Sequence, residues 1–222
     1  SSAASDVYKR QVLSLSVLMG VSLMGCQAKT KVEVQEDTVV ENQTNTQSLL
    51  YQYNEDGVNH LKAYYPTLEG LEFALKNIGN ELGDLTLTKL DGTTFDFSEL
   101  KNQKIMIEIN QDGCSYCKAN EPVTAKVLSE RDDVIHVPVF LNSTVEGIKE
   151  FYKELNLEMP KYVLIDNDKK LVNVFHATST PTTIFVDENN KISYVAEEVF
   201  DETSFNDALK IAFENEKIYE MK

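Results

Sequence analysis

Two cysteines separated by two residues, Cys114 and Cys117, place the strongest constraint on the fold of this chain. They follow residues 104–109, an apolar run typical of a buried strand, and residues 116–128 after them have helical periodicity. A cysteine pair with this spacing at the start of a helix can close a small, reversible disulfide. The sequence therefore predicts a strand, a turn and a helix, with a thiol pair at the turn.

The segments around this unit alternate between strand and helix patterns. A hairpin is expected first, because two alternating segments flank the turn signal Asp91-Gly92. Pro138 argues against a fully paired centre in its strand. The order predicts an α/β fold, in which helices cover both faces of a central mixed β-sheet. The expected strands are 84–90, 93–97, 104–109, 134–140, 184–186 and 192–195, and the expected helices are 116–128, 144–155 and 202–213.

The first 26 residues have the pattern of a secretory signal peptide rather than of a spanning helix. Residues 1–11 lack an initiator Met and look non-native. The apolar run that follows ends in Leu23-Met24-Gly25-Cys26, which resembles a bacterial lipobox, so Cys26 is the expected site of lipid attachment. The alternatives are an ordinary signal peptide with an incidental cysteine, or an uncleaved anchor.

Three further regions follow the signal peptide. Residues 27–48 are polar and predict a flexible linker, because they cannot bury enough apolar surface to fold alone. Residues 49–80 predict a helical lead-in with a single amphipathic helix. Residues 81–222 have the length of one domain. The apolar face of the lead-in helix is expected to consist of Leu68, Leu71, Leu75 and Ile78.

The formal net charge of −15 excludes one class of partner. So acidic a chain repels the phosphate backbone, and nucleic-acid binding is not expected. The same charge repels an anionic membrane surface. Residence at a membrane would therefore depend on the lipid at Cys26.

Three segments resemble the TlpA/ResA-like branch of the thioredoxin superfamily, which is related to the redoxins. They are Leu90 to Lys101, Ile105 to Pro122, and Pro181 to Asp187, within a similarity that runs from Ile78 to the end. The resemblance implies a thioredoxin-like fold with an N-terminal β-hairpin and a β-α insertion. It also implies that Pro181 is cis and lies against the cysteine pair, and that the activity is thiol–disulfide exchange.

The resemblance assigns roles to the residues around the pair. Cys114, at the helix N-terminus, is the expected nucleophile, and Cys117 is the expected resolving thiol. Thr180 and Pro181 would present a backbone edge to the substrate. Ser115 and Tyr116 would tune the thiolate and contact the substrate. No cofactor is expected beyond the redox-active disulfide Cys114–Cys117; zinc or copper binding by the cysteines is the alternative.

The chain departs from the family pattern beside the pair. It has no Trp, and Gln111-Asp112-Gly113 stands where the family has aromatic residues. Asn120 occupies the position where a glutamate is common. Glu108 lies where thioredoxin has a buried aspartate, and burial would raise its pKa and suit a base for Cys117. The alternatives are an outward-facing Glu108, or Glu121 as the base.

These features predict an extracytoplasmic, lipid-anchored thiol–disulfide oxidoreductase that reduces protein disulfides. Its expected partners are protein thiols and disulfides and a membrane protein that donates electrons. Two alternatives stay open. One is a disulfide oxidase or isomerase, because the compartment outside the cell is oxidising. The other is a non-catalytic envelope lipoprotein, which the missing aromatic residues before Cys114 favour.

Overall fold

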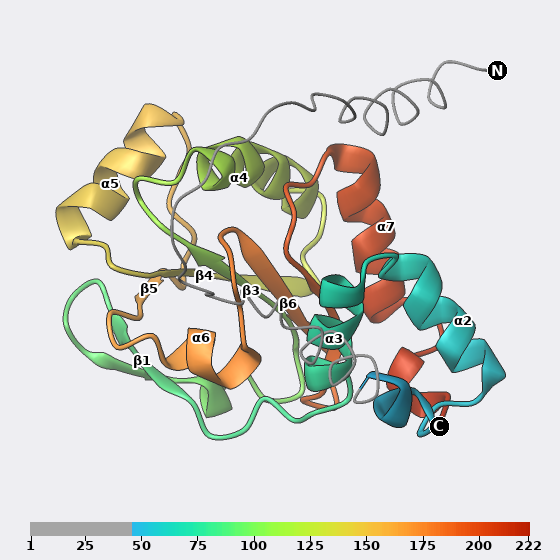
Figure 1. The fold of residues 1–222 in the computed structure, drawn as a ribbon. Helices are drawn as coiled ribbons and strands as arrows, with labels where there is room; N and C mark the ends of the chain where they lie inside the picture. The colour runs from blue at the N-terminus through green and yellow to red at the C-terminus, as the bar shows by residue number, and fades with distance from the viewer. Residues whose placement is uncertain (1–45) are drawn as a thin grey trace, which may run out of the picture. The chain divides into compact units, whose positions relative to one another are not determined.

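The computed structural model describes residues 46–222, and these residues form a seven-stranded sheet in the order β2-β1-β5-β4-β3-β6-β7 (Figure 1). The strands are β1 Thr86–Lys89, β2 Thr94–Asp96, β3 Lys104–Asn110, β4 Val134–Phe140, β5 Leu164–Ile165, β6 Thr182–Val186 and β7 Ile192–Ala196. β3 pairs in parallel with β4 and antiparallel with β6. The sheet is mixed, and the α/β fold class is confirmed.

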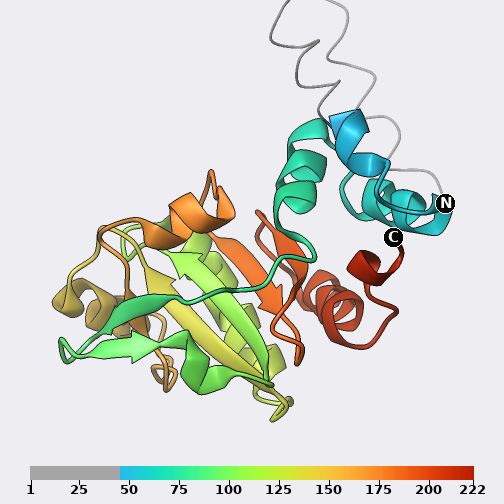
Figure 2. The ribbon, with the colours of Figure 1, turned by 90° about the horizontal axis from the view of Figure 1, so that it is seen from below.

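The amphipathic helix predicted from Leu68, Leu71, Leu75 and Ile78 is present, but a second helix that the sequence pattern did not indicate precedes it. α2 spans Glu55–Tyr64 and α3 spans Leu68–Asn77. Pro66 lies between them, and a proline disfavours helical backbone in the residue before it. Thr67 then caps α3 by accepting a hydrogen bond from the Gly70 N–H. Figure 2 shows both helices on the β7 side of the sheet, near α7 (Glu202–Phe213).

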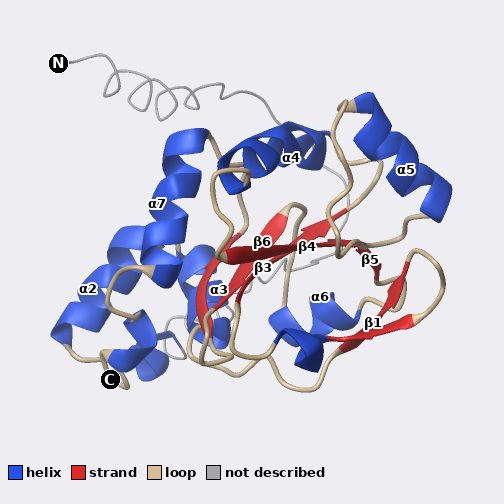
Figure 3. Ribbon diagram, turned by 180° about the vertical axis from the view of Figure 1, so that it is seen from behind, coloured by secondary structure: helices blue, strands red, loops and turns tan. Residues whose placement is uncertain are grey.

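Helices cover both faces of the sheet. α4 (Ser115–Leu128) packs against α7 on one face, and α6 (Lys170–Phe175) lies on the other (Figure 3). A continuously apolar central strand suits such a sheet, because neither face meets water. Every residue of β3 after Lys104 is buried. The remaining helices are α5 (Val145–Glu154) and the short 3-10 helices η2 (Phe97–Leu100) and η3 (Ile218–Glu220).

The segment between α5 and β6 contains two elements that the sequence patterns did not identify, β5 and α6. β5 has two residues and α6 has six, which is too short for periodicity to reveal. The N-cap residue of α6, Lys169, makes no capping hydrogen bond with its side chain. Instead, the Asp166 carboxylate accepts hydrogen bonds from the free N–H groups of Lys170 and Leu171 at the start of the helix. α5 and β5 lie between β4 and α6, in the segment where the resemblance implied a β-α insertion.

Pro138 is compatible with a central strand in this sheet. β4 pairs with β3 along its whole length but with β5 only at Val139 and Phe140. Pro138 therefore lies just before the part of β4 that has two neighbours. This arrangement agrees with the expectation that the strand is not fully paired at its centre.

Residues 46–48, which we expected in the linker, form a helical segment with Leu49 and Leu50. These two leucines pack against the hydrophobic core, which explains the difference. The predicted signal peptide, Cys26 and the rest of the linker lie outside the described residues. Within the described part of the chain, no helix has both the length and the apolar character needed to span a membrane.

Candidate active site

The two cysteines lie at the start of α4 and are joined by a disulfide. Cys114 is the N-cap of the helix, and its Sγ accepts a hydrogen bond of 3.1 Å from the N–H of Cys117. N–H groups at a helix N-terminus stabilise a thiolate. Cys117 is fully buried, whereas Cys114 is partly exposed. Cys114 is therefore the member of the pair that is accessible from solvent.

The loop before β6 lies against this disulfide. The Thr180–Pro181 peptide bond is cis, as the resemblance implied. The Sγ of Cys114 lies 3.6 Å from the backbone oxygen of Thr180 and 3.5 Å from its hydroxyl oxygen. The fold thus brings together two motifs that are 66 residues apart in sequence.

A carboxylate that sequence reasoning missed holds this loop in place. Glu197, directly after β7, accepts hydrogen bonds from the Thr178 N–H at 2.5 Å, the Thr178 hydroxyl at 2.9 Å and the Ser179 N–H at 3.2 Å. The Thr182 hydroxyl lies 3.5 Å from the same carboxylate. The only signal in the sequence is the run of hydroxyl residues before Pro181, because Glu197 is brought to it by the β6–β7 pairing.

The two residues between the cysteines face solvent. Ser115 and Tyr116 are both exposed, and the Tyr116 side chain retains 68% of its accessible surface. A large exposed aromatic ring beside the disulfide is well placed to contact a docking partner.

Glu108 faces the protein interior, so the alternative of an outward-facing side chain was wrong. It is fully buried on β3, opposite Pro138 and Thr183 on the neighbouring strands. Its carboxylate accepts hydrogen bonds of 3.0 Å from Asn120 Nδ2 and from His136 Nε2. Burial alone would raise the pKa of Glu108, but the His136 and Asn120 hydrogen bonds and the His136 charge outweigh it and lower the pKa. The expected raised pKa is therefore not found.

Asn120 on α4 is hydrogen-bonded to β3 and to the segment before α7. Besides donating to Glu108, its Oδ1 accepts a hydrogen bond of 2.7 Å from the Phe200 N–H. It occupies the position at which the family resemblance suggests glutamate. A neutral amide there can donate to the Glu108 carboxylate, which a second carboxylate could not do.

Glu121 is the buried carboxylate with the raised pKa. It lies on α4 four residues after Cys117, so both side chains lie on one face of the helix. Its side chain is 1% exposed. Burial, followed by repulsion from Glu108, raises the pKa of Glu121 to about 7, although the charge of His136 and the nearby Tyr152 hydroxyl partly offset this. A carboxyl group that titrates near neutral pH can accept and release a proton.

Glu108, Glu121 and His136 form a compact cluster of ionisable side chains. Their donor atoms all lie within 4.8 Å of one another, and within the described residues this is the one group of His, Cys, Asp or Glu with such geometry. Structural zinc sites use four ligands, commonly cysteines and histidines. Neither cysteine of the disulfide is part of this group.

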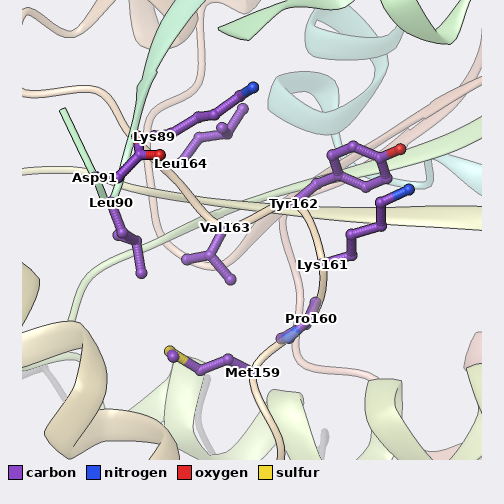
Figure 4. Close-up of a pocket in the computed structure, with 9 residues that line it drawn as sticks. All are labelled: Lys89, Leu90, Asp91, Met159, Pro160, Lys161, Tyr162, Val163 and Leu164. Atoms are coloured by element: carbon purple, nitrogen blue, oxygen red, sulfur yellow. The ribbon is translucent and has the colours of Figure 1, made fainter. Parts of the chain in front are cut away.

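One pocket borders the site, and a second is linked to it by packed apolar residues. One, of about 270 Å³, is lined by Thr180, Gln111 and Lys169 among others, and so opens beside the loop that touches Cys114. The other, of about 300 Å³, lies between the β1–β2 turn and residues 159–164 (Figure 4). Leu90 and Val163 of this second pocket belong to the same apolar cluster as Cys117. A cluster of packed apolar residues therefore connects the lining of the pocket in Figure 4 with Cys117.

One known protein family matches the part of the chain that contains the sheet and the site. The sequence model of the Redoxin family matches residues 77–211, more than half of the chain. This range contains both cysteines, the cis-proline loop and the buried carboxylates. No curated protein sequence matches the chain.

Solved structures with a similar fold include three bacterial proteins. A secreted Mycobacterium tuberculosis disulfide oxidoreductase homologous to E. coli DsbE is 19% identical, with a TM-score of 0.50 over 57% of this chain and 94% of its own. A Chlorobium tepidum thiol:disulfide interchange protein of the thioredoxin family is 18% identical, with a TM-score of 0.52 over 60% and 96%. The thioredoxin domain of a Bacteroides vulgatus thiol-disulfide oxidoreductase is 18% identical, with a TM-score of 0.52 over 61% and 97%. These likenesses confirm the thioredoxin-like fold.

Proposed function

This chain belongs to the Redoxin family, and we propose that it reduces disulfide bonds in proteins with the Cys114–Cys117 pair. One observation carries the proposal. A partly exposed Cys114 caps α4 and touches the cis-proline loop at Thr180, while its partner Cys117 is buried. This arrangement suits a reaction in which one thiol attacks a substrate and the other completes the exchange.

The reaction begins with reduced cysteines. The Cys114 thiolate attacks one sulfur of a substrate disulfide, so a Cys114–substrate bond forms, the substrate S–S bond breaks and one substrate thiolate leaves. The Cys117 thiol then loses its proton to a base, and its thiolate attacks Cys114 Sγ. The second substrate thiolate leaves, the Cys114–Cys117 disulfide forms, and two electrons have passed to the substrate.

Glu121 is the better candidate for the base. It shares a helix face with Cys117, is buried, and has a pKa of about 7. Glu108 was the other candidate, but its lowered pKa makes it a weaker proton acceptor.

The location of the protein outside the cytoplasm belongs to the same proposal. The lipobox-like ending at Cys26 supports a lipid anchor, and the polar residues 27–45 would hold the folded part away from the membrane. A membrane protein would then return the oxidised pair to its reduced form. Incorporation of labelled fatty acid into the full chain, but not into Cys26→Ala, tests the anchor.

A trapping experiment tests the activity. With Cys117→Ser, a disulfide-bonded protein such as insulin should accumulate as a covalent complex through Cys114, which a thiol reductant releases. Cys114→Ser should form no complex. A wild-type chain that leaves insulin intact, together with a Cys117→Ser variant that traps nothing, would instead support a non-catalytic protein.

A further inference from the structure

His136 connects a buried pair of carboxylates to the surface. It lies on β4, and its Nε2 donates a hydrogen bond of 3.0 Å to Glu108 Oε2. The Glu108 side chain is fully buried, whereas the His136 side chain keeps 10% of its accessible surface. Of the three ionisable groups in this cluster, His136 is therefore the one in contact with solvent.

The third member of the cluster has an unused oxygen. Donor atoms of Glu108, Glu121 and His136 lie within 4.8 Å of one another, a gap that one water molecule can bridge. Oε2 of Glu121 is buried and has no hydrogen-bond partner among the described residues. A buried polar atom without a partner is costly, so one that persists beside ionisable groups calls for an explanation.

We propose that His136 is the residue through which the buried carboxylates of Glu121 and Glu108 exchange protons with solvent, in the service of Cys117. The inference rests on the proposed function, because a proton must leave Cys117 during each turnover. Cys117 is fully buried and cannot pass that proton directly to bulk water.

The proton follows a balanced path. Cys117 gives its proton to the Glu121 carboxylate, which becomes a neutral carboxylic acid. Glu121 passes a proton to Glu108, and Glu108 passes it to Nε2 of a neutral His136 ring that carries its own proton on Nδ1. The imidazolium formed in this way releases the Nδ1 proton to water, and proton exchange with water then restores the starting tautomer of the ring. The cluster returns to its starting charge, and the net change is one proton moved from Cys117 to solvent.

The charges that face His136 suit this role. Glu108 on β3 and Glu121 on α4 face the ring, and Tyr152 on α5 faces the two carboxylates. Burial would lower the pKa of His136, but the Glu108 hydrogen bond and the charges of both carboxylates outweigh it and raise the pKa. The two carboxylates therefore favour the protonated form of the imidazole.

Single-turnover kinetics separate the two thiols. Dithionitrobenzoate releases one coloured thiolate when Cys114 attacks and a second when Cys117 completes the exchange. The experiment uses the full chain with Cys26→Ser, so that only these two thiols react. In His136→Gln we expect the second phase at pH 7 to be slower by about 10- to 100-fold. The first phase should stay within about twofold, and His60→Gln on α2, where the half-buried ring lies outside the cluster, is the matched control.

Rescue distinguishes proton transfer from a structural role. Added imidazole should restore the second phase of His136→Ala in proportion to its concentration, because the His136 site keeps some contact with solvent. Loss of both phases without rescue would indicate a structural residue and overturn the proposal. An unchanged second phase in His136→Gln would overturn it too, and the proposed function would still stand. A wild-type chain that releases no second thiolate would instead refute the proposed function.

A measurement on the unsubstituted residue covers the case in which both His136 variants unfold. In the His60→Gln, His176→Gln chain, His136 is the only histidine left. Acylation of that ring with diethyl pyrocarbonate should slow the second phase and spare the first. A modified ring with an unchanged second phase would contradict the proposal.

Discussion

Replacing Glu121 with glutamine should make the stability of the oxidised protein less dependent on pH. Glu121 is 1% exposed, and its pKa rises to about 7 on folding from 4.5 in the unfolded chain. Between these values the folded state binds more protons than the unfolded state. The free energy of unfolding therefore falls as pH rises through this window, and it does not recover above it.

The size of the effect follows from the shift. The difference between 4.5 and about 7 is roughly 2.5 units, and each unit corresponds to about 1.4 kcal/mol. Charging Glu121 should therefore cost the folded protein about 3 kcal/mol between pH 4.5 and pH 8. Glutamine at this position stays neutral, so this part of the pH dependence disappears. The pKa of His136 is also raised, so its loss of a proton lowers the free energy of unfolding of both proteins as pH rises.

Urea unfolding of the oxidised wild type and of Glu121→Gln at a series of pH values tests this reasoning. The disulfide keeps both thiols from titrating. The difference between the two curves reports Glu121 together with the part of the His136 pKa shift that the Glu121 charge causes. We expect Glu121→Gln to gain about 2.5 kcal/mol relative to wild type on going from pH 5 to pH 8. Parallel curves would show that Glu121 is not a buried carboxyl with a raised pKa.

Two further substitutions test the loop clamp and the helix cap. Glu197→Ala removes the hydrogen-bond acceptor for Thr178 and Ser179, so reduction of insulin should slow several-fold, whereas alkylation of Cys114 by iodoacetamide should keep its rate. The exposed Glu198→Ala is the control. Equal loss in both assays would contradict a loop-positioning role. Asp201→Ala removes the N-cap of α7 and should lower the urea concentration at the unfolding midpoint more than the exposed Asp207→Ala does. Equal effects would refute the capping assignment.

The sequence predicted the parts of the fold that carry strong local signals. The helix predicted at residues 202–213 coincides with α7, and an Asp201 cap precedes it. β3 and β4 were visible because runs of apolar residues mark strands buried on both faces. β5 was not visible, because its two residues are held by pairing with β1 and β4 rather than by a pattern of their own.

The site could be predicted from sequence where all residues of a motif lie in one short segment. The cysteine spacing and the start of α4 lie in one short segment, so the roles of Cys114 and Cys117 could be proposed from sequence. The pKa of Glu108 could not be predicted, because His136 comes from another strand, 28 residues away. The Glu197 clamp was missed for the same reason, since it depends on strand pairing that no local pattern records.

The reduction potential of the Cys114–Cys117 pair tests the central claim most directly. The full chain with Cys26→Ser would be equilibrated with thiol–disulfide buffers of defined potential, and the fraction of oxidised pair measured at each. The account predicts a potential of roughly −270 mV or lower, as in a reducing thioredoxin. A potential near about −120 mV would contradict the proposed direction and favour disulfide formation. A pair that never equilibrates with the buffers would contradict any exchange activity.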